Sequence, residues 1–229
     1  MTRVRHRSFS SPDCLKKAAM PNQNGTVYGL TILSPIIDDE KATPSHDLQI
    51  RSYLAALPTG EDSPFAQAPG THLARLVVMD DVVFVGAPSI EEHLQSKYLV
   101  FESNCDGDLD GYLLGLAASA PQHVDAIWSH CVGYPGAARP QAFVDYMKSC
   151  QIETTFFFAA VNNKSVPETL RALQTQRAVA DFIARHQGME PARIQAEFAG
   201  FVAKLKSAPL PKPGSTASPR AIKTGGRNE

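Results

Sequence analysis

Several carboxylates stand close together in a turn that ends an apolar run, within the stretch KYLVFESNCDGDLDG of residues 97–111. Loops that join a strand to a helix on a rigid scaffold often carry binding and catalytic residues. We therefore predict that this turn lines a ligand site, with Asn104, Asp106 and Asp108 in contact with a substrate. The alternative is a capped helix start, because Asp106 or Asp108 suits an N-cap and acidic residues suit the positive end of a helix dipole.

The motifs of several well-known ligand sites are absent from the sequence. Asp106, Asp108 and Asp110 are spaced like early calcium ligands, but the later bidentate Glu of an EF-hand loop is missing. The sequence also contains no phosphate-binding Gly-rich loop, no G-x-S-x-G and no H-E-x-x-H. Because these motifs are absent, the sequence does not identify the turn as a calcium site or as a nucleotide-binding site.

A second group of reactive side chains lies in AIWSHCVGYPG, residues 126–136, which has no clean helical or strand period. A histidine, a thiol and a phenol in one loop can line a pocket. We predict His130 as a catalytic residue, and Trp128 and Tyr134 as substrate-binding residues. The alternative is a buried loop whose His and Tyr satisfy backbone groups. His130 is a poor base for Cys131, since adjacent side chains rarely face each other.

Arg75 lies inside an apolar strand, and Glu102 lies inside another. Charged groups among Leu, Val and Phe are costly unless they are paired or exposed. We predict that Arg75 and Glu102 meet across neighbouring strands. They form either a structural ion pair or the polar end of a substrate cavity, and in the second case Arg75 is a catalytic candidate.

The hydrophobic patterns predict an alternation of strands and helices. The predicted strands are residues 26–33, 72–80, 98–103 and 153–161. The predicted helices are residues 45–57, 108–118, 140–150, 165–185 and 191–205. Apart from the helix at residues 140–150, the predicted elements up to residue 161 follow the order β-α-β-β-α-β. This order predicts an α+β fold with a ferredoxin-like antiparallel sheet, with additional C-terminal helices.

A single sheet of this kind has helices on one face and needs a cover for the other. Both faces of the predicted strands are largely apolar, as in YLVF and TTFFFAAV. The additional helices can cover the second face, or a second copy of the sheet can do so. The second arrangement predicts a homodimer of the α+β-barrel kind.

Length and charge predict one domain with two tails. The 229 residues carry a net charge of −1, but residues 1–24 carry +4 and residues 208–229 carry +3, which leaves −8 for residues 25–207. We predict a single α+β domain over residues 25–207 between two disordered basic tails. An acidic body argues against nucleic-acid binding, because phosphate contacts need a basic face.

The sequence also limits the compartment. No apolar run approaches the length of a membrane span, and no apolar core follows the N-terminal arginines. The four cysteines are widely spaced and include no C-x-x-C, a pattern that suits a reducing cytoplasm. We therefore expect a cytoplasmic protein without a transmembrane segment.

Three segments resemble a group of uncharacterised bacterial proteins of ferredoxin-like build: GTHLARLVVMDD, YLVFESNCDGDLDGYL and DAIWSHCVGYPG. The resemblance spans roughly residues 25–175 and brings no established activity. More distantly, the architecture resembles the dimeric α+β-barrel superfamily, which includes small monooxygenases, chlorite dismutase-like proteins and dye-decolourising peroxidases. This resemblance implies a cavity between sheet and helices, often used for haem or an organic substrate.

Residues 107–111 match the G-x-x-D-G spacing that dye-decolourising peroxidases use on the distal side of haem. The match implies that Asp110 shuttles a proton during peroxide cleavage and that a histidine ligates the iron, with His130 as candidate. The chain departs from those peroxidases in having one ferredoxin-like half where they usually have two. The resemblance thus predicts a small-molecule-binding protein of the α+β-barrel kind. If the protein is an enzyme, the resemblance predicts a peroxidase- or monooxygenase-type oxidoreductase. The alternative is a non-catalytic interaction protein that dimerises or docks on a partner enzyme.

Overall fold

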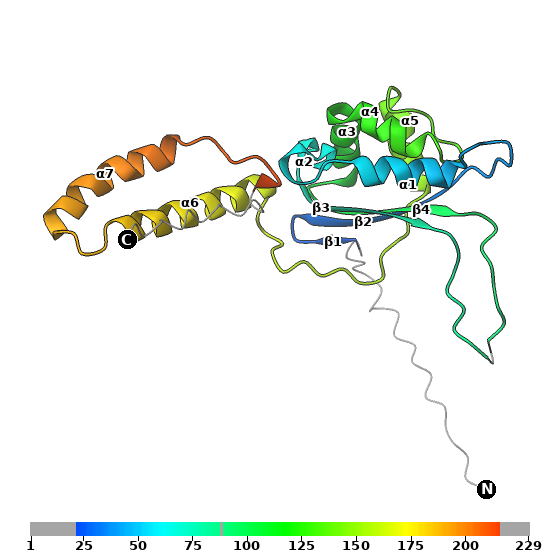
Figure 1. The fold of residues 1–229 in the computed structure, drawn as a ribbon, viewed down its shortest axis with the longest axis horizontal. Coiled ribbons are helices and arrows are strands. Elements are labelled where there is room, and N and C mark those ends of the chain that lie inside the picture. The colour runs from blue at the N-terminus through cyan, green and yellow to red at the C-terminus, as the bar shows by residue number, and fades with distance from the viewer. Residues whose placement is uncertain (1–21, 88, 216–229) are drawn as a thin grey trace, which may run out of the picture.

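One antiparallel sheet carries a layer of helices on one side, and a separate pair of helices extends from it (Figure 1). The computed structural model describes residues 22–87 and 89–215. The strands are β1 Gln23–Asn24, β2 Val27–Pro35, β3 Thr71–Met79 and β4 Tyr98–Asp106. The helices are α1 His46–Ala56, α2 Pro64–Gln67, α3 Leu109–Ser119, α4 Pro121–Trp128, α5 Pro140–Ser149, α6 Val166–Arg185 and α7 Pro191–Ser207, with a 3₁₀ turn, η2, at Gly60–Asp62.

The sheet has the order β1–β2–β4–β3, and every neighbouring pair is antiparallel. β4 is the best-paired strand, because β2 and β3 lie along its two edges. Its register with β2 runs from Val27 opposite Asp106 to Pro35 opposite Tyr98. Three of the predicted strands are thereby confirmed, and so is the predicted α+β class.

The hydrophobic core lies between the sheet and the helices α1–α5. Side chains alternate across a strand, so β4 directs Leu99 and Phe101 into this core, where neither is exposed. Phe101 packs edge-on against Trp128 at the end of α4, with ring centroids 5.3 Å apart. The helical layer is therefore tightly joined to the sheet, and helix α4 accounts for part of the stretch that showed no period.

The prediction of a strand at residues 153–161 is wrong. The hydrogen-bonding edge of β2 is already occupied by two other pieces of chain. Asn22 accepts from the Gly29 N–H at 2.7 Å, and Ile152 donates its N–H to Thr31 at 2.9 Å. Residues 153–161 therefore form no strand and cross the second face of the sheet beside β1 and β2 as irregular chain. The full ferredoxin-like strand order is accordingly not confirmed.

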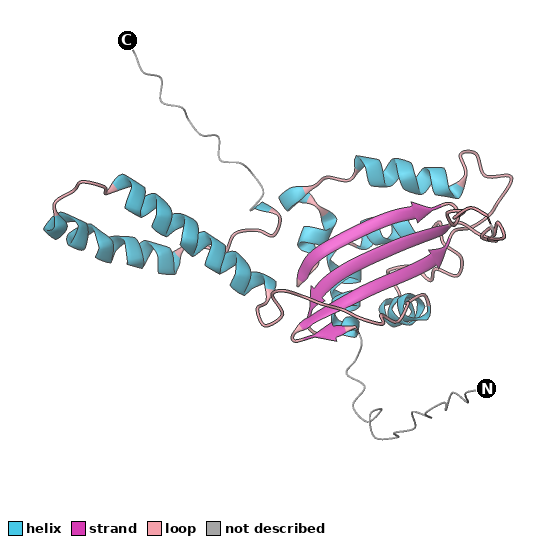
Figure 2. Ribbon diagram, turned by 90° about the horizontal axis from the view of Figure 1, so that it is seen from below, coloured by secondary structure: helices cyan, strands magenta, loops and turns pink. Residues whose placement is uncertain are grey.

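The two last helices do not cover the sheet. Ser165 and Glu168 form a capping box at the start of α6, and α7 folds back antiparallel to it. Figures 1 and 2 show this pair extending sideways from the domain, while the second face of the sheet carries no helix. We call this second face the open face. Of the two covers that the sequence left open, the additional helices do not occupy this face.

The predicted boundaries of the domain shift slightly. Residues 22–24 belong to the sheet rather than to the predicted tail, since β1 pairs with β2. Residues 208 and 209 accept hydrogen bonds from Arg171 and Gln174 of α6. The remaining tail residues, 1–21 and 216–229, lie outside the described residues. Within the described ranges, no helix has both the length and the apolar character needed to cross a membrane.

Candidate functional site

A cavity of about 430 Å³ lies at the start of α3, in the turn that connects the end of β4 to this helix. Gly107 makes the sharp turn with φ of 81°, a value that glycine adopts without strain. Asp108 then caps α3 by accepting the Gly111 N–H at 2.8 Å. The lining residues are Gln23, Tyr28, Gly107, Asp108, Leu109, Asp110, Lys148 and Gln151. The cavity thus includes two of the predicted site residues, Asp108 and Asp110.

Polar groups from distant segments meet in this cavity. Lys148 of α5 donates to Asp110 at 2.8 Å, and this neighbouring carboxylate raises the pKa of Lys148. Gln151 donates to the Tyr28 hydroxyl at 2.8 Å. The site therefore offers carboxylates, an ammonium group, an amide and a phenol. A small polar molecule can bind here by exchanging the Asp110–Lys148 pair for contacts of its own.

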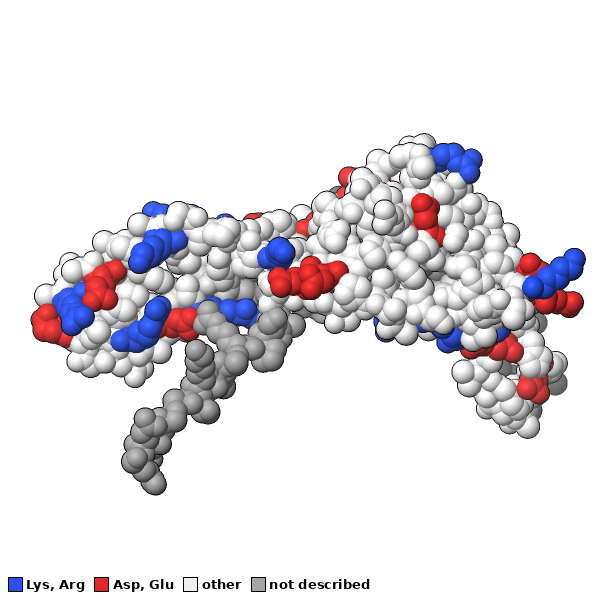
Figure 3. All heavy atoms as spheres, turned by 45° about the horizontal axis from the view of Figure 1, so that its top comes forward, with Lys and Arg blue, Asp and Glu red and all other residues white. Residues whose placement is uncertain are grey.

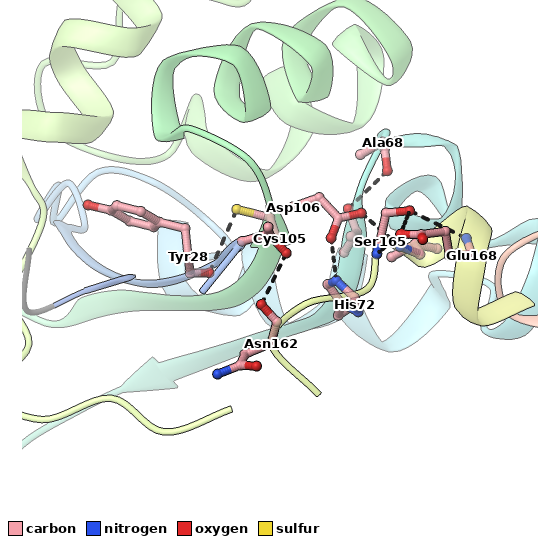
Figure 4. A network of polar contacts seen from close by, with 11 residues as sticks. Tyr28, Ala68, His72, Cys105, Asp106, Asn162, Ser165 and Glu168 are labelled. Atoms are coloured by element: carbon pink, nitrogen blue, oxygen red, sulfur yellow. Dashed lines mark hydrogen bonds and ion pairs between the residues drawn. The ribbon is translucent and has the colours of Figure 1, made fainter. Parts of the chain in front are cut away.

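Asp106 lies outside this cavity and joins the sheet to α6 (Figure 4). One of its carboxylate oxygens contacts the Nε2 atom of His72 at 2.6 Å, and the other accepts the Val166 N–H at 2.8 Å. Its backbone N–H donates to Gly70 at 2.9 Å. Asp106 thus holds three chain segments together, which is a structural task rather than the predicted contact with substrate.

His130 lies at the rim of the helical layer and contacts a second histidine. Its Nδ1 atom is 2.9 Å from Nδ1 of His46, so one ring donates and the other accepts. Burial lowers the pKa of His130, and the neighbouring His46 lowers it further. The sequence did not indicate this partner, because His46 is 84 residues away along the chain.

Trp128 and Tyr134 are parts of the packed interior. Trp128 is fully buried and packs edge-on against Phe101. The Tyr134 hydroxyl donates to Asp125 at 2.7 Å. Burial and this hydrogen bond raise the pKa of Tyr134. Both residues therefore match the buried-loop alternative better than the predicted substrate contact.

Arg75 and Asn104 lie on the open face, on the other side of the sheet from α3. Arg75 stands directly opposite Glu102 in the register and forms an ion pair with it. Asn104 lies opposite Leu73 on the same face. The predicted meeting of Arg75 and Glu102 is confirmed, and the pair stands at the surface of the sheet.

The three predicted catalytic residues do not converge. Asp110 follows the end of β4 that pairs with Val27, whereas the His130 carbonyl accepts from Ile37, beyond the other end of β2. Ten residues of strand span about 30 Å. A haem with His130 on one side and Asp110 on the other would need both residues beside the same iron. The two residues do not fit that arrangement.

Sequence reasoning missed the residues that complete the α3 cavity. Lys148 and Gln151 lie about 40 residues after Asp110, at the end of α5 and just beyond it, and Tyr28 belongs to the first long strand. An exposed Lys near the end of an amphipathic helix resembles any solvated surface residue. Only the packing of α5 against α3 brings these groups together.

A second cavity, of about 300 Å³, lies at the opposite end of the sheet, between the start of α1 and the chain entering β4. Asp47 is buried there and accepts from Lys97 at 2.7 Å and from Ser45 at 2.6 Å. These hydrogen bonds lower the pKa of Asp47. The buried carboxylate of Asp47 is thus already paired within the chain.

Comparison of the chain with models of protein families, with curated proteins and with solved structures finds no match.

Proposed function

We propose that this protein is a non-catalytic interaction protein that pairs with a second copy of itself through the open face of its sheet. One observation carries the proposal: the face that holds no helices presents a set of apolar side chains, and no helix of the described residues covers them. The strands contribute Leu33 of β2, Leu73, Val77 and Met79 of β3 and Tyr98 and Val100 of β4. Leu73 and Val77 are exposed, and both belong to the edge strand β3.

The charges of the open face fit a second copy. Arg75 and Glu102 lie in one row across its centre. A two-fold dimer brings the same patch of both partners together, so the patch must be complementary to itself. A face with one cation paired to one anion meets this condition, because the two charges already satisfy each other within each copy. No net charge then opposes the association of the apolar rows.

The α+β-barrel arrangement gives this dimer its geometry. β4 lies between β2 and β3 and runs antiparallel to both, which supports a ferredoxin-like build with an incomplete fourth strand. Two such sheets pack face to face about 10 Å apart with their apolar side chains interleaved. The polar residues that could have formed an enzyme site are instead dispersed over both faces and both ends of the sheet.

Sedimentation equilibrium of the full chain tests the proposal. We expect a dimer, and we expect Leu73→Asp with Val77→Asp to raise its Kd by about 30-fold or more, as loss of a central contact does. Leu48→Asp is the matched control, because Leu48 is equally exposed but lies on α1 in the helical layer. A wild-type chain that stays monomeric at every concentration contradicts the proposal.

The α3 cavity supports a second candidate, small-molecule binding. The observation in its favour is the meeting of Asp110, Lys148, Gln151 and Tyr28 around one cavity. A panel of amino acids and carboxylic acids should then raise the thermal unfolding temperature of the wild type but not of Lys148→Ala. Absence of any such shift counts against this candidate.

The oxidoreductase form of that candidate has its own test. Haem binding through His130 would give a Soret band on addition of haem, and His130→Ala would abolish the band. The separation of His130 from Asp110 along the sheet leads us to expect no such band.

A further inference from the structure

The open face alone is small for a stable dimer. Three strands of nine residues, spaced about 4.8 Å apart with about 3.3 Å per residue, cover roughly 400 Å². A standard protein interface buries about 800 Å² on each partner. Elements beside the sheet must therefore contribute to the interface, and two apolar features outside the sheet are candidates.

The first feature is residues 82–87, VVFVGA, which we call the apolar arm. Val83 is 86% exposed and Val85 is 81% exposed. Asp81 fixes the base of this segment by accepting the Leu94 N–H at 2.8 Å and contacting His93 at 2.7 Å. The His93 contact and the backbone N–H groups lower the pKa of Asp81 to about 2. The two ends of the segment are thus joined through Asp81, and the apolar arm between them is exposed to solvent.

The position of the apolar arm favours contact with a molecule on the open face. The chain between β3 and β4 leaves the end of the sheet and drops to the side away from the helices (Figure 1). Glu91 and Glu92 follow the arm and carry its negative charge, because Asp80 is already paired with Arg51 and Lys97 and Asp81 with His93. An apolar segment with a negative rim needs an apolar groove with a positive rim.

The second feature is such a groove, at the start of α6, which we call the α6 groove. Its volume is about 780 Å³, and its lining is mostly apolar. Val161 and Leu210 are both exposed in it. Its border carries Lys164, Arg171 and Glu168, which together leave a positive charge, with Lys164 paired with Glu168 at 3.2 Å. The complete lining is Val161, Lys164, Pro167, Glu168, Thr169, Arg171, Ala172 and Leu210. Charged side chains of both signs alternate along the projecting helices of this region (Figure 3).

Within one molecule the arm cannot reach this groove. The arm follows the last residue of β3, Met79, whereas α6 begins beside Asp106, the last residue of β4. These two positions are at opposite ends of strands about 30 Å long. In a face-to-face dimer whose two-fold axis lies across the strands, the arm end of one sheet lies over the α6 end of the other.

We infer that the apolar arm of one copy binds in the α6 groove of the second copy, so that the dimer carries two reciprocal arm contacts. This inference rests on the proposed dimer and names the surfaces that enlarge its interface. Val83, Phe84 and Val85 fill the apolar groove, and Glu91 and Glu92 approach Lys164 and Arg171. The occupant is a segment of this same chain.

Cross-linking of mixed-isotope protein tests the arm contact directly. Wild-type chains grown in ¹⁴N and ¹⁵N are mixed and treated with a carbodiimide, which joins a carboxylate to an amine without a spacer. We expect peptide pairs that join Glu91 or Glu92 of one isotope to Lys164 of the other. Absence of arm-to-groove pairs in a sample that sediments as a dimer overturns the inference and leaves the proposed dimer standing.

Arm variants give the second measurement. Val83→Asp with Val85→Asp should raise the dimer Kd by about 10-fold or more, because a charge cannot enter the groove at low cost. Both residues are exposed in the single chain, so the variant should fold as the wild type does. Leu48→Asp is again the control. An unchanged Kd for the arm variant overturns the inference, whereas a monomeric wild type overturns both the arm contact and the dimer.

Discussion

The two faces of the sheet differ although they are built from the same strands. On the covered face, Leu99 and Phe101 are completely removed from water by the helical layer. On the open face, Val77 is 46% exposed, while its neighbour Val78 on the covered face is only 9% exposed. Adjacent residues of one strand thus have different surroundings. The covered face is completed within the described chain, whereas the proposed dimer completes the open face with a second copy.

The largest expected difference is in the free energy of unfolding, between an aspartate placed on the covered face and one placed on the open face. Val78→Asp should destabilise the fold by about 3 kcal/mol or more, because it buries an unpaired carboxylate. Val77→Asp should change the stability of the monomer by less than about 0.5 kcal/mol, because its side chain reaches water. Chemical denaturation at low protein concentration measures both values. Similar losses for the two variants would contradict the assigned difference between the faces.

A smaller effect is expected where irregular chain crosses the open face. A Cβ atom placed on Gly29 would lie 2.7 Å from the ring of Phe157. Gly29→Ala should therefore cost about 1–3 kcal/mol through overpacking. In a Phe157→Ala background the same change should cost much less, and the double-mutant cycle of unfolding free energies measures the difference. Additive losses would show that Phe157 does not pack on this glycine.

The local parts of the fold could be predicted from the sequence. The β-branched runs of β2, β3 and β4 and the helix predicted at residues 165–185 depend on neighbouring residues, and all of them formed. The strand predicted at residues 153–161 failed for a non-local reason. Asn22 comes from a segment that was assigned to a tail, and it occupies the edge of β2 that this strand needed.

The candidate site could be predicted in the same partial way. Asp108 was found because strand-to-helix turns have a local signature, and Asp110 was found through the G-x-x-D-G spacing. Lys148 was not found, because its contact with Asp110 exists only after α5 packs on α3. Trp128 was assigned to a pocket because sequence patterns do not distinguish an aromatic residue of the core from one that lines a cavity.

The smallest expected effect is the pH dependence of folding stability that comes from the pair His46 and His130, at the rim of the covered face. The folded-state pKa of His130 is lowered, so the unfolded chain, with a pKa near 6.5, binds a proton more readily. Stability should therefore fall as the pH drops through about 6.5. The loss should stay below about 1 kcal/mol, because solvent screens a half-buried group. Denaturation of wild type and His130→Gln at pH 7.5 and 5.5 measures it, and equal pH dependence would contradict the assignment.

The central claim is that the open face is covered by a second copy, and hydroxyl-radical footprinting over a range of protein concentrations tests it most directly. We predict that the labelling of Leu73 and Val77 falls as the concentration rises, while the labelling of Leu48 in the helical layer stays constant. Labelling of Leu73 and Val77 that stays the same from dilute to concentrated protein would contradict the account.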